Sequence, residues 1–201
     1  MANIVRAHLV IEGFRPLLWN AFTLDAIPLQ KRERTGVAGN DPEEWKRTVL
    51  ATAQGQLYLP DTYLFGALRD GAKHTKRGRS SLQPLVAATL QVAPERILLD
   101  RFLPAGEELP TDPHQPVYLD VRSVKNPSTR GRNIRYRVAA APGWQAAFDL
   151  SWDLTVVSRE QMQAVALDAG QLVGVGDGRH IGQGRFAVKQ FEFTAGHNEA
   201  R

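Results

Sequence analysis

Alternation of hydrophobic and polar residues is the main pattern along this chain, and it is typical of β-strands with one buried face. Residues 96–100 are instead a short apolar run, as in a buried strand. The predicted strands are residues 4–11, 48–51, 56–59, 96–100, 117–124, 133–140, 144–152 and 185–193. Those at 117–124 and 133–140 are expected to pair as a long hairpin.

Two segments instead repeat their apolar residues at helical spacing. The first follows Asp61, which can cap a helix, and runs to about Lys73. The second begins with a capping box, in which Gln161 lies three residues after Ser158, and continues to Val173. The order strand, helix, several strands, helix, strand predicts an α+β domain with antiparallel pairing, in particular a ferredoxin-like core.

Length and composition limit the possibilities further. The 201 residues suffice for one substantial core, so we expect a single domain spanning residues 1–201. The chain has no cysteine, which excludes disulfides and thiolate metal sites, and no segment approaches the ~20 apolar residues of a membrane span. We therefore expect a cytoplasmic protein that does not contact the membrane. Its five histidines are scattered, so no metal site or cofactor is expected.

A glycine-rich stretch lies between the second helix and the last strand. Five of the 17 glycines fall within eleven residues here, at Gly174, Gly176, Gly178, Gly182 and Gly184. Their spacing matches neither the P-loop nor the dinucleotide-binding loop. Such a run permits positive φ and close approach of backbone N–H groups to a ligand, and Arg179, His180 and Arg185 add positive or polar side chains. A hairpin connection with loose turns is equally compatible with the glycine content.

Positive charge gathers in three places, although the net charge is only +4. The first is the end of the helix at 61–73 and the following loop, the second is the predicted hairpin, and the third is the glycine-rich stretch. Three clusters suit an extended polyanion, whereas each alone could be a solvated surface. The cations of the first two clusters are Arg69, Lys73, Lys76, Arg77, Arg79, Lys125, Arg130, Arg132 and Arg135, and Arg137 continues the charge along the second hairpin strand.

Three segments resemble the RAMP superfamily of CRISPR-associated proteins. They are Gly13-x-x-Pro-Leu-Leu18, the segment 57–69 with its Pro60 and Gly66-Ala-Leu-Arg69, and Gly182-Gln-Gly-Arg-Phe186. The nearest likeness is to the subunits that polymerise along CRISPR RNA as the backbone of effector complexes. The chain departs from that pattern at Gly176-Asp177-Gly178, where an acid replaces part of a glycine pair.

The resemblance implies an RRM-related, ferredoxin-like core with insertions at about 25–55 and 103–140. It also implies that the glycine-rich loop and the basic helix hold single-stranded RNA, and that a protruding hairpin, here Lys125 to Arg135, interrupts the bound strand. Implied partners are copies of the same chain and other effector subunits. On this interpretation the RNA-binding residues are the cations of the first two clusters with Gly176, Gly178, Arg179, His180, Gly182, Gly184 and Arg185.

Two other functions remain open from the sequence. Some RAMP relatives cut RNA by metal-independent acid–base chemistry, for which His180, Asp61 or Asp70 are candidates, His180 because histidine titrates near neutral pH. Alternatively, the basic patches could face acidic protein partners in a structural or assembly protein without nucleic acid.

Overall fold

A computed structural model describes residues 3–23, 41–106, 108–125 and 131–194, and it has an α+β architecture with antiparallel sheets. The main sheet has the strand order β11-β1-β10-β7-β3, and β6 also pairs with β10. Every pairing in it is antiparallel. Its strands are β1 (Ile4–Gly13), β3 (Gln56–Pro60), β6 (Gln91–Ala93), β7 (Arg96–Phe102), β10 (Gln145–Asp153) and β11 (Phe186–Thr194).

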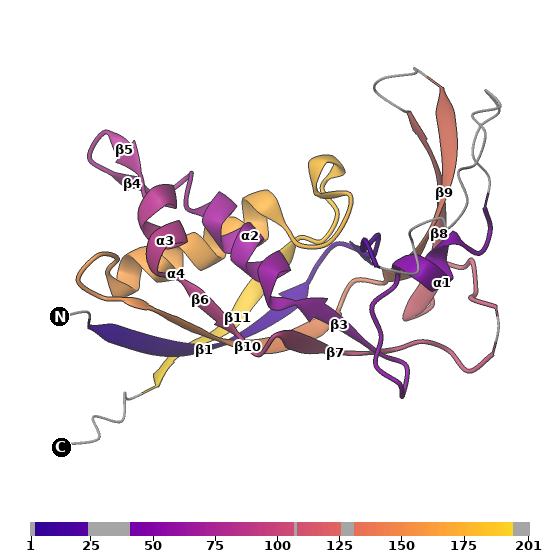
Figure 1. Cartoon of the computed structure of the whole chain (residues 1–201), viewed down its shortest axis with the longest axis horizontal. Coiled ribbons are helices and arrows are strands. Elements are labelled where there is room, and N and C mark those ends of the chain that lie inside the picture. Colours follow the sequence, from indigo (N-terminus) through magenta and orange to yellow (C-terminus); the bar gives the residue numbers. More distant parts are fainter. Residues whose placement is uncertain (1–2, 24–40, 107, 126–130, 195–201) are drawn as a thin grey trace.

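Helices α2 (Asp61–Gly71), α3 (Gln83–Thr89) and α4 (Arg159–Asp168) lie on the same side of this sheet (Figure 1). The helices predicted after Asp61 and after Ser158 are thereby confirmed as α2 and α4. The capping box of α4 is present as predicted, but α2 has Pro60 at its N-cap and no side-chain cap, so Asp61 is instead its first residue. The last turn after α4 widens into a π-helix, η2 (Ala169–Val173).

Three tryptophans anchor the core between these two layers. Trp19, Trp144 and Trp152 are fully buried. Each indole N–H donates to a backbone carbonyl, at 2.9 to 3.0 Å, so burial leaves no indole N–H unpaired. The aromatic residues of the strand at 144–152 are thus core residues, as their alternation predicts.

A smaller sheet stands beside the main one. It consists of β2 (Leu17–Leu18), β9 (Arg132–Ala140) and β8 (Val117–Lys125), in that order. The hairpin of β8 and β9 extends away from the helical layer (Figure 1), which confirms the two strands predicted there. Arg130 and the basic segment Lys31-Arg-Glu-Arg34 lie outside the described residues.

The remaining elements are short. Helix α1 (Glu44–Thr48) lies against β9, and the cation-rich turn after α2 is a two-stranded hairpin of β4 (Lys76–Arg77) and β5 (Ser80–Ser81). The strand predicted at residues 48–51 is wrong. Only Ala51 forms a bridge, to Leu57, because α1 occupies the start of that segment.

Two arginines expected to continue the charge along β9 are instead neutralised within the fold. The guanidinium of Arg135 is paired with the carboxylate of Glu44 on α1, which also accepts a hydrogen bond from the backbone N–H of Tyr136. Arg137 is buried and paired with Asp177. A strand pattern shows which side chains share a face, but not that acids from α1 and the glycine-rich stretch will cover that face.

The capping box gives the first testable prediction. Ser158→Ala removes the hydroxyl that accepts from the backbone N–H of Gln161, so we expect it to lower the free energy of unfolding by about 1 kcal/mol. Ser158→Thr keeps an acceptor and should lower it less. Urea unfolding followed by circular dichroism measures both, and equal losses for the two variants would contradict the prediction.

Candidate functional site

The glycine-rich stretch forms a compact loop between η2 and β11. A single 3₁₀ turn, η3 (Arg179–Ile181), lies at its tip. Gly178 and Gly182 flank this turn with φ of 71° and 82°, values in the left-handed region that favours glycine. The tip therefore presents Arg179 and His180 as exposed side chains on a tightly turned backbone.

Other glycines of the loop are required by close packing. A Cβ on Gly184 would lie 1.8 Å from the carbonyl oxygen of Val175, and one on Gly176 would lie 2.7 Å from the carbonyl oxygen of Leu18. Both have positive φ. The loop thus folds back on itself and presses against β2, so the alternative of a loose hairpin connection is wrong.

Backbone N–H groups in this loop are largely used inside the protein. The amide of Gly184 donates to Pro16 O at 2.7 Å, and that of Gly182 to Arg179 O at 3.0 Å. These two amides are therefore not free to bind a ligand. The prediction that the backbone N–H groups of the glycines contact a ligand is wrong for Gly182 and Gly184. Ligand contacts in this part of the loop are therefore left to the side chains of Arg179, His180 and Arg185.

Asp177 joins the loop to the smaller sheet. Its backbone N–H donates to Leu18 O at 2.9 Å, and its Oδ2 lies 3.2 Å from Nε of the buried Arg137. The acid that departs from the RAMP-like pattern is therefore the counter-ion of a buried arginine. The positive charge of Arg137 on β9 balances the negative charge of Asp177.

Between the loop and the C-terminal end of α2 lies an open depression of about 560 Å³. Its polar lining comes from two elements far apart in the sequence: α2 and the residues just after it, and the loop with the first residue beyond it. The titratable residues that line it are Asp70, Lys73, His74, Asp177, Arg179, His180 and Arg185.

Asp70 is the charged centre of the α2 side. Its Oδ1 lies 3.1 Å from both Arg69 Nη2 and Lys73 Nζ, and its Oδ2 lies 3.7 Å from Arg179 Nη1. Partial burial acts to raise the pKa of Asp70, but the hydrogen bonds and charges of Lys73 and Arg69 outweigh it and lower that pKa. Asp70 is therefore a stable carboxylate that positions cations, which disfavours it as a general acid near neutral pH.

Among the described cations that line the depression, Arg185 is the one that forms no ion pair. Its Nη1 is buried and has no hydrogen-bond partner among the described residues. Burial, and then the positive charge of Arg179, lower the pKa of Arg185. Two guanidinium groups thus repel each other at one edge of the depression, and an anion placed there would relieve that repulsion.

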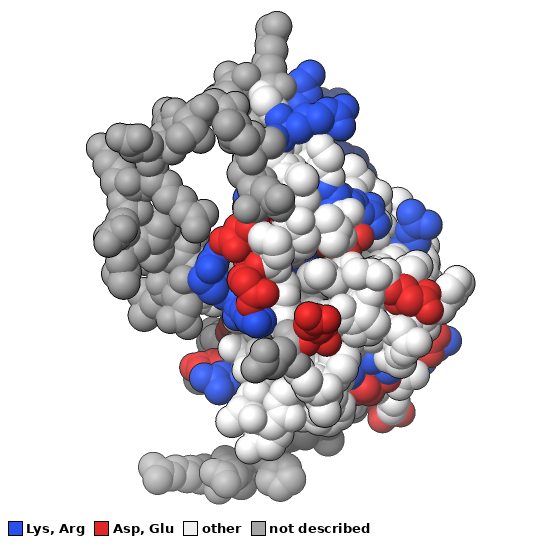
Figure 2. Space-filling model, turned by 90° about the vertical axis from the view of Figure 1, so that its right-hand side faces the viewer, with Lys and Arg blue, Asp and Glu red and all other residues white. Residues whose placement is uncertain are grey.

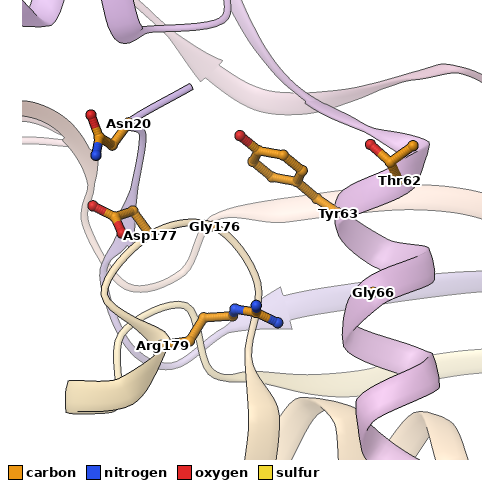
Figure 3. A pocket seen from close by; sticks show the side chains of 7 residues that line it. All are labelled: Asn20, Thr62, Tyr63, Gly66, Gly176, Asp177 and Arg179. Carbon is orange, nitrogen blue, oxygen red and sulfur yellow. The ribbon is translucent and has the colours of Figure 1, made fainter. Parts of the chain in front are cut away.

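A second, smaller pocket adjoins the depression (Figure 3). Its volume is about 260 Å³, and it lies between the N-terminal half of α2, the loop, and Asn20 after β2. The phenol of Tyr63 reaches from α2 toward Asn20, whereas the guanidinium of Arg179 reaches from the loop toward α2. Both cavities share Gly176, Asp177 and Arg179.

The predicted site residues fall into three groups in space. Lys73, Gly176, Gly178, Arg179, His180 and Arg185 meet at the depression, and Arg69 lies beside it through its contact with Asp70. Lys76, Arg77 and Arg79 are exposed in the β4–β5 hairpin, whereas Lys125 and Arg132 are exposed on the β8–β9 hairpin. Arg135 is also a predicted site residue, but it is less available to bind a ligand because Glu44 neutralises its charge.

Sequence reasoning missed His74, Tyr63 and Asn20. His74 follows the end of α2 and lines the same depression as His180, although 106 residues separate them. No local motif marks any of the three. Asn20 follows Trp19, whose indole N–H donates to Tyr58 O in the strand before α2, and periodicity does not reveal such a long-range contact.

The part of the chain that the structure describes contains no cluster of three or more histidine or acidic residues that could hold a metal ion. None of its helices is long and apolar enough to cross a membrane.

The loop gives the second prediction, a matched pair of substitutions. Gly182→Ala incurs only the cost of positive φ, about 1–2 kcal/mol, because a Cβ there meets no atom within 4 Å. Gly184→Ala adds the overlap with Val175 O and should cost a further ~1–3 kcal/mol. Thermal unfolding compares them, and a Gly184→Ala protein as stable as Gly182→Ala would show that the loop is not packed this tightly.

Comparison with known proteins assigns no family to this chain. No family model matches it, and no curated protein matches it. Among solved structures, a similar chain occurs in the cryo-EM structure of the Type III-B Cmr-beta bound to cognate target RNA, with a TM-score of 0.47 and 12% sequence identity. The likeness covers 94% of this chain and 60% of that chain.

Proposed function

We propose that this protein binds single-stranded RNA along its sugar–phosphate backbone, as a repeating, non-catalytic subunit of a cytoplasmic ribonucleoprotein complex of the CRISPR effector type. Copies of itself and other effector subunits would be its partners. The observation that carries the proposal is the convergence of Lys73, Arg179 and Arg185 on one open depression.

The charge balance of this depression favours an anion. Its two carboxylates, Asp70 and Asp177, are each already paired with arginines of the fold. Five positive groups, namely Lys73, Arg179, Arg185 and the flanking Arg69 and Arg137, therefore face two negative ones. The phosphates of a nucleic-acid backbone can supply this negative charge along an extended ligand. Lys and Arg contacts to phosphates give affinity without sequence information.

The other cation groups support an extended ligand rather than a single phosphate. The β4–β5 hairpin directly follows α2 and places Lys76 and Arg79 beyond the depression. Figure 2 shows the opposite end of the molecule. Basic side chains lie toward the top of this view, and basic and acidic side chains lie next to one another lower down. Lys125 and Arg132 are exposed on the described part of the β8–β9 hairpin, which suits contact with an RNA strand leaving the depression.

The order of the strands supports the proposed architecture. Strands and helices β1, α2, β6, β10, α4 and β11 follow one another as β-α-β-β-α-β, and β11-β1-β10-β6 are neighbours in that order. This is the arrangement expected of a ferredoxin-like, RRM-related core. Residues 1–201 would then be one RAMP-like domain with insertions at about 25–55 and 103–140, the second of which supplies the β8–β9 hairpin.

Salt-dependent RNA binding tests this function. Fluorescence polarisation with a labelled single-stranded RNA at several salt concentrations should show affinity that falls steeply with salt. Arg185→Ala and Lys73→Ala should each weaken binding and reduce the slope of log K against log salt by about 1, because each removes one phosphate contact. Arg6→Ala is the matched control, since Arg6 is exposed between the inward-facing Val5 and Ala7 and so points away from the helical layer.

Three outcomes of that experiment contradict the proposal. Binding by the wild type that ignores salt would exclude the phosphate contacts. Equal losses for Arg6→Ala and Arg185→Ala would exclude the depression as the site. Protein that binds no RNA, and that carries no nucleic acid by its A260/A280 ratio when purified, would favour the structural or assembly function instead.

A second function, metal-independent RNA cleavage, is favoured by one observation. His74 and His180 line the same depression as the cations. Two histidines beside phosphate-binding groups can act as general base and general acid in attack of a 2′-hydroxyl on the adjacent phosphate. Asp61 is less suited, because it lies at the other end of α2 and its carboxylate accepts from the backbone N–H of Thr62.

Cleavage assays separate the two functions. Labelled RNA incubated with the protein in EDTA should remain intact if the protein only binds. Products ending in 2′,3′-cyclic phosphate, lost in both His74→Ala and His180→Ala while RNA affinity stays within about threefold, would establish the endoribonuclease instead. His114→Ala is the control, because His114 is exposed in the connection before β8.

A further inference from the structure

The smaller pocket between α2 and the loop is lined by polar groups that the proposed contacts to the RNA backbone do not involve. We infer that it receives one unstacked nucleobase of the bound strand, with guanine preferred. This inference rests on the RNA-binding function proposed above, and it adds a sequence-reading site to it.

The wall formed by α2 leaves room for a flat ring. Gly66 lines the pocket, and a Cβ built on it would meet no atom within 4 Å, so the space in front of the helix is open there. The volume of about 260 Å³ is large enough for a purine. The half-buried Tyr63 ring forms the neighbouring wall, where an aromatic side chain can contact the face or edge of a base.

Three polar side chains border this space. Asp177 accepts hydrogen bonds, Asn20 can both donate and accept, and the hydroxyl of Tyr63 can donate. Burial, and then the charge of Asp177, raise the pKa of Tyr63, so its hydroxyl keeps its proton at neutral pH. The pocket therefore places hydrogen-bond acceptors and donors close together around an open space.

Guanine complements this set. Its Watson–Crick edge presents two N–H donors, which suit the carboxylate of Asp177, next to a carbonyl oxygen, which suits the donors of Tyr63 or Asn20. Adenine presents an amino group beside an acceptor nitrogen and has only one donor for the carboxylate. Because Oδ2 of Asp177 is buried beside Arg137, Oδ1 is the carboxylate oxygen that would accept from the base.

Arg179 connects the base pocket to the phosphate depression. It lines both cavities, and its guanidinium reaches from the loop toward α2 (Figure 3). A nucleotide whose phosphate contacts Arg179 is therefore next to the smaller pocket. The strand would be held by its backbone at the depression while one base leaves the stack and enters beside Tyr63.

Filling the pocket tests this inference. Gly66→Leu should project a side chain into the open space without a clash, and Gly66 lies inside a helix, where leucine has the higher propensity. We expect this variant to bind a short mixed-sequence RNA about tenfold more weakly than wild type. Its affinity for an abasic ribose-phosphate oligomer of the same length should be unchanged, and so should its salt slope.

Gly66→Ala is the matched control, because a single methyl group fills little of the pocket and should keep affinity within about twofold. Asn20→Ala is a second variant that does not depend on filling the pocket. Wild type should prefer an oligoadenylate with interspersed guanines over plain oligoadenylate by about three- to tenfold, and Asn20→Ala should reduce that preference. Thermal unfolding of each variant confirms that it is folded.

The outcomes distinguish this inference from the function on which it rests. If wild type binds both the RNA and the abasic oligomer equally, or if Gly66→Leu binds RNA as wild type does, the base pocket is excluded while backbone binding stands. If wild type binds neither oligomer, the RNA-binding function itself fails. A loss of affinity by Gly66→Leu for RNA alone, together with the guanine preference, supports the base pocket.

Discussion

The close backbone contact between the glycine-rich loop and β2 is the constraint on which the rest of this structure depends. Gly184 and Asp177 donate hydrogen bonds to carbonyls at Pro16 and Leu18, and a Cβ on Gly176 would collide with Leu18 O. Since β2 is also the strand that pairs with β9, this contact fixes the small sheet against the main one. The positions of the depression, the smaller pocket and the β8–β9 hairpin all follow from it.

Electrostatic pairing explains which cations are left for a ligand. Glu44 and Asp177 neutralise Arg135 and Arg137, so β9 carries little free charge near its base. Asp70 instead gathers several cations around one carboxylate, which aligns them without cancelling them, and the buried Nη1 of Arg185 has no hydrogen-bond partner in the described part of the chain. Positive charge therefore remains concentrated at the depression, because Glu44 neutralises an arginine elsewhere and Asp70 is shared among several cations.

Local sequence patterns predicted most of the elements, because strand alternation and the capping box at Ser158 depend on near neighbours. They also marked the loop and the cations of α2. They could not predict that amides at Gly182 and Gly184 are used internally, nor that Asn20, Tyr63 and His74 line the cavities. Those facts depend on contacts between segments that are distant in the chain, and one sequence gives no information on such contacts.

The ion pair between Asp177 and Arg137 has a mechanical consequence. The same short loop is bonded on one side to the hairpin strand β9 and contacts α2 on the other through Arg179 and Asp70. Any force that tilts the hairpin, such as a neighbouring molecule pressing on it, must strain one of these two contacts. Strand β9 is therefore linked to α2 through residues that line the depression.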